Sequence, residues 1–165
     1  MAESTHTFAR NLEHTDWRAA VYAACIAAAT FLVVQMLVAG LVFGYGPWLP
    51  VRMIGAIALG TRALAETGFP VVVTLVAFLL HLGLSIMTAF ILAPVIQGMS
   101  LPRSWLVGAA GGVVIYLVNF HLMTGVFTWF AAIRGWSTLG SHVVFGIVLA
   151  GAYHGCRRRD SGPIR

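Results

Sequence analysis

The chain alternates between four long apolar stretches and short connections that each carry arginine. The stretches cover residues 19–43, 69–96, 105–127 and 138–154. The first three match or exceed the ~20 residues that an α-helix needs to cross a ~30 Å hydrocarbon core, and the fourth lies near the ~17-residue lower limit. The pattern predicts an all-α, polytopic membrane protein with four transmembrane helices.

The connection after the first stretch contains a further helical pattern. Glycines and prolines at residues 44–50 end the first helix, and Pro50 can open a new one. Over residues 51–66 apolar residues recur at helical spacing, while two arginines and a glutamate lie elsewhere on the surface. We expect a short interfacial helix on the membrane, with Arg62 and Glu66 one turn apart and able to pair. A lid over the bundle is the alternative.

Composition supports a membrane protein and limits its organisation. Apolar residues make up 59% of the chain and charged residues 9%, whereas soluble domains average ~25% charged. The length suits one bundle and no second domain. We therefore expect an N-terminal segment at 1–18, the bundle at 19–154 and a basic tail at 155–165.

The arginines predict the orientation, because basic residues concentrate on the cytoplasmic side of membrane proteins. Four crossings place both termini and the loop 97–104 on one side, which holds seven of the ten arginines. Both termini are therefore expected in the cytoplasm. The seven are Arg10, Arg18, Arg103, Arg157, Arg158, Arg159 and Arg165, and the other three are Arg52, Arg62 and Arg134.

The N-terminal segment and the cysteines agree with a cytoplasmic N-terminus. Acidic residues interrupt the basic start of the chain, and the following apolar run is too long for a signal peptide, so the first helix is expected to be retained. Cys25 and Cys156 lie toward the cytoplasmic ends of their helices without motif spacing. We expect neither a disulfide nor a metal site from them.

Small residues at four-residue spacing predict close helix packing, which drives association in lipid. The stripes leave open whether one of them is a dimer face. They comprise Ala20, Ala24 and Ala28; Gly108 and Gly112; Gly146 and Ala150; Gly151 and Gly155; and a weakly polar stripe of Ala77, His81 and Ser85.

The predicted spans contain no aspartate, glutamate, lysine or arginine. Ion-coupled transporters place an acidic residue within the membrane to bind the ion. We therefore expect no independent secondary transport, and we see no internal repeat of the kind that transporters use.

Three histidines are the candidate cofactor ligands. His81, His121 and His142 lie ~18, ~12 and ~6 Å from the outer ends of their helices at 1.5 Å per residue. They suggest haem or copper ligands or a proton relay, although paired haem ligands need similar depth. A histidine bonded to a serine or a carbonyl is the alternative for His81 and His142.

Helical geometry separates Asn119 from His121 by ~200°. Asn119 shares the close-packed face with Gly112 and Tyr116, so His121 is expected to point outward, toward headgroups or a partner.

The outer connections gather aromatic residues and arginines in one thin layer, as aromatic belts do at interfaces. This layer is the expected interaction surface, and no soluble basic module indicates nucleic-acid binding. Its candidate residues are Trp48, Arg52, Asn119, Trp129, Arg134 and Trp136.

Several segments between Pro47 and Tyr153 resemble a group of small four-helix bacterial membrane proteins. They are residues 48–54, 116–120, 129–130, 134–136 and 142–146. The resemblance implies this fold and a bacterial inner membrane but no activity, and it points to Asn119, Trp129, Arg134 and His142. Some members carry a sodium:proline symporter label, which four spans without an intramembrane acid do not support.

Two classes of function follow. The first is a non-enzymatic scaffold or accessory subunit that binds lipids and either copies of itself or another membrane protein, with no cofactor. The second is a haem- or metal-binding electron-transfer protein that uses the histidines, and a small oligomeric channel comes third. The sequence has no Ser–His–acid set, phosphate loop or spaced metal motif, so we expect no enzyme.

Overall fold

The computed structural model describes residues 10–65 and 69–160. Four helices in this part are long and apolar enough to cross a membrane, and no strand occurs in it. The predicted all-α class of a membrane protein is therefore confirmed. Glu66 and the last residues of the tail lie outside the described part, and the predicted Arg62–Glu66 pair lies there with them. The spanning helices are α2 (Trp17–Leu41), α4 (Val71–Ile96), α5 (Leu101–Leu117) and α6 (Trp136–Asp160).

Helix ends fall at residues with clear physical roles. Asp16 caps α2 by accepting a 2.9 Å hydrogen bond from the Ala19 N–H, as a short acidic side chain does at an N-cap. The turn between α4 and α5 uses Gly98 at φ +78°, a backbone angle that favours glycine. α6 extends beyond the predicted 138–154, so its span of 22 residues, Trp136–Arg157, is long enough to cross the membrane.

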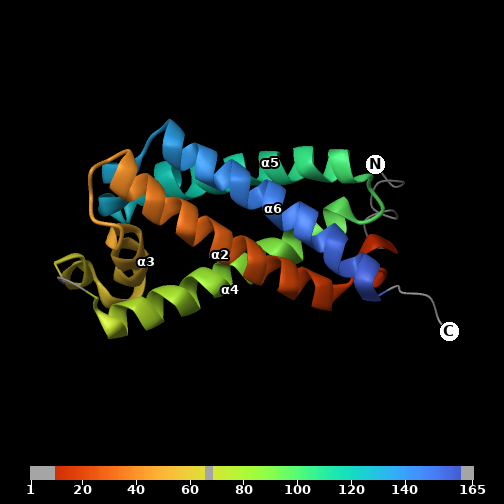
Figure 1. Cartoon of the computed structure of the whole chain (residues 1–165), viewed down its shortest axis with the longest axis horizontal. Helices are drawn as coiled ribbons and strands as arrows, with labels where there is room; N and C mark the ends of the chain where they lie inside the picture. Colours follow the sequence, from red (N-terminus) through yellow and green to blue (C-terminus); the bar gives the residue numbers. More distant parts are fainter. Residues whose placement is uncertain (1–9, 66–68, 161–165) are drawn as a thin grey trace.

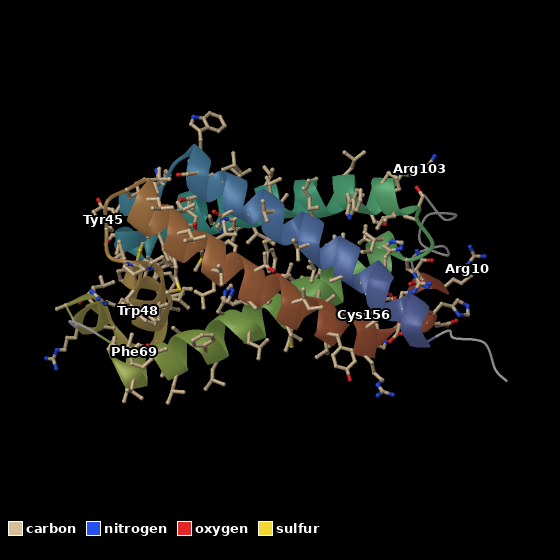
Figure 2. All side chains as sticks on the ribbon, in the orientation of Figure 1. Arg10, Tyr45, Trp48, Phe69, Arg103 and Cys156 are labelled. Carbon is tan, nitrogen blue, oxygen red and sulfur yellow. The ribbon has the colours of Figure 1, made fainter. Side chains whose placement is uncertain are left out.

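The spanning helices form a row in the order α4, α2, α6, α5 (Figure 1). α2 and α6 occupy the middle of the row, where each packs against two spanning neighbours, whereas α4 and α5 touch little although a short turn joins them. Both termini and the α4–α5 turn lie at one end, here called the near end, with Arg10, Arg103 and Cys156 (Figure 2). The arrangement matches the predicted four antiparallel crossings.

The closest helix contact joins α5 to α6 through glycines. A side chain on Gly112 would meet the backbone carbonyl of His142, and a side chain on Gly146 would meet the backbone of Gly108. Two predicted glycine pairs and the alanine stripe are therefore used inside the chain, since Ala20 and Ala24 are also fully buried, whereas Gly155 of the last predicted stripe is exposed. Direct backbone contact of this kind replaces the hydrophobic effect as the source of association within lipid.

At the opposite, far end, a short helix fills the space between the spanning helices. This helix, α3 (Leu49–Leu59), is followed by a 3₁₀ turn at Thr61–Leu64, and it lies between the far ends of α2 and α4 (Figure 1). Val51, Met53 and Ala56 are each 1% exposed. The apolar helix predicted for 51–66 thus begins two residues earlier and packs into the bundle, where its apolar side is covered by protein.

Hydrogen bonds between side chains and backbone lock the near end. The Tyr153 hydroxyl donates to Gln97 Oε1 at 2.9 Å and accepts from the Asp16 N–H at 3.3 Å. Gln97 Nε2 donates in turn to the His14 carbonyl at 2.9 Å. One ring therefore joins α6, the end of α4 and the start of α2.

Gly146→Val is expected to lower stability by about 1–3 kcal/mol or more, because the added methyl groups must push α5 away from α6. Gly155→Val on the same helix is the control, since nothing lies within 4 Å of the position of its new Cβ. Thermal unfolding in detergent compares the two variants. Equal unfolding temperatures would contradict the α5–α6 contact.

Tyr153→Phe is expected to cost about 1–2 kcal/mol, because both hydrogen bonds at the hydroxyl are lost and their partners stay buried. Tyr22→Phe, at a residue that is 53% exposed, should leave stability unchanged. Chemical unfolding followed by circular dichroism measures the difference. If the Tyr153→Phe protein were as stable as the wild type, the hydrogen bonds of the Tyr153 hydroxyl would not stabilise the near end.

Candidate functional site

Two of the three candidate histidines meet around one phenylalanine in the middle of the row. Phe31 of α2 stacks on the His81 ring at 5.3 Å between centroids and meets the His142 ring edge-on at 4.7 Å. The depths expected from the sequence separated these histidines by ~12 Å along the membrane normal. The helices bring both rings into contact with Phe31, so Phe31 is the residue that organises the pair.

Each of the two imidazoles is held by a helix carbonyl. His81 Nε2 lies 3.1 Å from the Ala28 oxygen of α2, across a helix interface. His142 Nδ1 lies 2.8 Å from the Thr138 oxygen, one turn earlier on α6. A bond from one ring nitrogen to a carbonyl fixes the tautomer and leaves the other nitrogen of His142 as an acceptor.

Aromatic rings enclose His142 on the α5 side. Tyr116 and Phe120 stack on each other at 5.3 Å, and each meets the His142 ring edge-on, at 5.8 and 5.5 Å. With Phe31 they form an aromatic cage, the name used below for these three rings. His142 is 3% exposed within it.

A π-helical turn spans Val118–Leu122 beside this cage. Phe120, four residues after Tyr116, lies on the buried face that the sequence analysis assigned to Asn119, while Asn119 is half-buried. His121 is exposed and touches the edge of Tyr116, with 5.6 Å between ring centroids, so it does not join the other two histidines.

The expected outer-face layer divides into buried and exposed members at the far end. Trp129 Nε1 donates to the Met53 carbonyl at 3.1 Å and so ties the last connection to α3. Arg134 donates to Thr124 Oγ1 at 2.9 Å and is exposed. Trp136 is 87% exposed, and Trp48 meets the Phe69 ring edge-on at 4.8 Å (Figure 2). Trp129 is thus structural, and Trp136 stays available for contact.

Polar groups in the described core concentrate in the far half. Gln35, Thr74 and Arg52 each carry a buried atom without a hydrogen-bond partner. Sequence analysis missed Gln35 and Phe31, although both continue the alanine stripe Ala20–Ala24–Ala28 at helical spacing. The signal in the sequence is that this stripe, occupied by alanines earlier in α2, continues with the bulky Phe31 and then the polar Gln35. Closer to the near end, the core between α2, α4 and α6 is built from alanines and a few large apolar side chains.

The arrangement limits what the histidines can bind. No group of three or more His, Cys, Asp or Glu side chains placed to hold a metal occurs in residues 10–65 and 69–160. The Phe31 ring contacts both His81 and His142, the two histidines that would have to ligate an iron together.

Comparison with known proteins gives no further guide to the site. No family model, curated protein or solved structure matches the chain.

Phe31→Ala is expected to destabilise the protein by about 3–5 kcal/mol, because it leaves a cavity between two helices and removes ring contacts to both histidines. Phe78→Ala on α4, where the ring is half-exposed, is the matched control and should cost far less. Thermal unfolding in one detergent ranks the two. Similar losses would show that Phe31 does not organise the core.

Proposed function

We propose that this protein is a non-enzymatic accessory subunit of the bacterial inner membrane, which presents a lipid-exposed helix face to another membrane protein. The observation that carries the proposal is the row of large apolar side chains that α4 exposes. Only 22% of the most apolar window of α4 is buried within the chain, the same share as for the span Leu101–Gly125, against 39% for α2 and α6. The helix turns a long row of large apolar side chains outward, comprising Val71, Val72, Leu75, Phe78, Leu79, Leu84, Met87, Phe90 and Ile91.

The interior supports a scaffold better than a channel. Alanines pack the near half of the core, with Ala20, Ala23 and Ala24 at 0% exposure. Phe31 fills the centre above them. The gap between α2, α4 and α6, lined by residues such as Ala89 and Leu149, is narrower than a water molecule. A chain packed in this way supplies rigid surfaces to its surroundings.

The inner membrane and the cytoplasmic placement of both termini are part of the proposal. They rest on the excess of arginines at the near end and on the resemblance to small bacterial four-helix membrane proteins, which stays a prediction. The far end, with α3 and Trp136, would then face the periplasm. An accessory subunit in this orientation offers its partner α4 within the membrane and the aromatic layer outside it.

The histidine pair supports a second candidate, a haem protein. A histidine that binds a metal usually donates its other ring N–H to a carbonyl or carboxylate, and His142 Nδ1 has such a partner in the Thr138 carbonyl. Purified protein that is coloured, and a His81→Ala variant that is not, would favour haem over the accessory role.

Native mass spectrometry of protein released gently from its own membrane tests the accessory role. We expect a complex with a second protein, or a multiple of this chain. A photo-crosslinking residue at Leu79 of α4 should trap that partner, whereas the same residue at Val33 on the exposed side of α2 should trap little. A chain that carries lipid alone and gives no adduct from Leu79 would exclude the proposal.

A further inference from the structure

Three buried polar atoms at the far end have no hydrogen-bond partner. They are Gln35 Oε1 on α2, Arg52 Nε on α3 and Thr74 Oγ1 on α4. Gln35 and Thr74 are 4% and 5% exposed, and Arg52 is half-buried. Buried polar groups are almost always paired in proteins, so three unpaired ones point to a group that the chain itself does not supply.

The packing of α2, α3 and α4 makes these three residues neighbours. α2 and α4 run antiparallel, and the contact between the Ala28 carbonyl and His81 fixes their register. Leu32, Ala77 and Val51 form one apolar cluster a turn further toward the far end. The next level toward the far end lies three residues after Leu32 on α2 and three residues before Ala77 on α4.

That next level holds Gln35 on α2 and Thr74 on α4. Arg52 follows directly after Val51 on α3 and so adjoins it. Three different helices thus each carry an unpaired hydrogen-bonding group at the far end.

The chemistry of the three groups selects an oxyanion. Arg52 Nε and the Thr74 hydroxyl donate, and the Gln35 amide donates once it is turned to present its nitrogen, which is an ordinary reassignment of the two amide atoms. Arg52 also brings a permanent charge, and it has no ion pair within the described residues. A water molecule would satisfy the hydrogen bonds and leave that charge uncompensated, whereas an oxyanion satisfies both.

We propose that Arg52, Gln35 and Thr74 form a binding site for a phosphate-type oxyanion at the far end of the bundle. The oxyanion belongs to a lipid headgroup or to a free ion. The exposed apolar side chains of α4 begin at this level with Val71, Val72 and Leu75, along which acyl chains can lie. Trp48 packs against the cluster of Leu32, Val51 and Ala77 and meets the Phe69 ring edge-on (Figure 2), and such aromatic rings are typical of the headgroup region.

Two probes distinguish the sources of the oxyanion. Native mass spectrometry of protein exchanged into phosphatidylcholine nanodiscs with and without phosphatidylglycerol reports retained anionic lipid. Titration with inorganic phosphate, followed through the ¹⁵N signal of Arg52 Nε–H, reports a free ion. We expect Arg52→Gln to weaken binding of whichever probe is bound by about tenfold or more, and Gln35→Leu with Thr74→Val to weaken it as well. Arg62→Gln, at an exposed arginine of the same connection, should bind like the wild type.

Several results would overturn the site. The proposal is excluded if neither probe binds the wild-type protein, or if the Arg52→Gln and Arg62→Gln proteins bind the probe equally well. The ¹⁵N signal of Arg52 Nε–H could instead shift in the Glu66→Gln variant and not respond to either probe. That result would assign the guanidinium to an ion pair within the chain. Because Arg52→Gln can unfold the far end, the wild-type Nε–H signal serves as the readout that needs no variant, and a signal that ignores both probes excludes an oxyanion.

Discussion

The backbone contact between α5 and α6 is the constraint on which the rest of the structure depends. Gly108 and Gly112 place α5 directly against Gly146 and the carbonyl of His142. In lipid, apolar side chains gain little by leaving their surroundings, so close approach and van der Waals contact must supply the association. This contact fixes the rotation of α6, and that rotation directs His142 and Phe145 toward Phe31 of α2. α4 then joins the row mainly through α2.

The two halves of the bundle follow different packing rules. Near the termini, alanines allow α2, α4 and α6 to approach closely, and the Tyr153 hydroxyl joins their ends by hydrogen bonds. Toward the far end the helices separate, and the space is filled by rings and by α3. The far half buries Gln35 and Thr74, each with an atom that has no hydrogen-bond partner, whereas the near half buries Thr15 and Ser104 with hydrogen bonds to neighbours.

Sequence patterns predicted the spans, their antiparallel order and the internal use of glycine and alanine, because length and small-residue spacing act locally along one helix. Contacts between helices were harder to derive. Depth counted along separate helices did not foresee that His81 and His142 flank Phe31, since tilt and register are set by neighbours. Phe120, four residues after Tyr116, occupies the buried face that was expected for Asn119, and no residue in that stretch indicates the π turn at Val118–Leu122. The apolar residues of α3 predicted a helix but not the depth to which it packs.

The bond from Trp129 to the Met53 carbonyl has a consequence for the order of assembly. It joins positions 76 residues apart, and Met53 also packs against Tyr116, Phe120 and Ile133. α3 is therefore synthesised before most of the residues that it packs against. During synthesis α3 must wait at the membrane surface, as an amphipathic helix can, until the segment after α5 arrives. Closure of the far end therefore has to follow the synthesis of the last connection between spans.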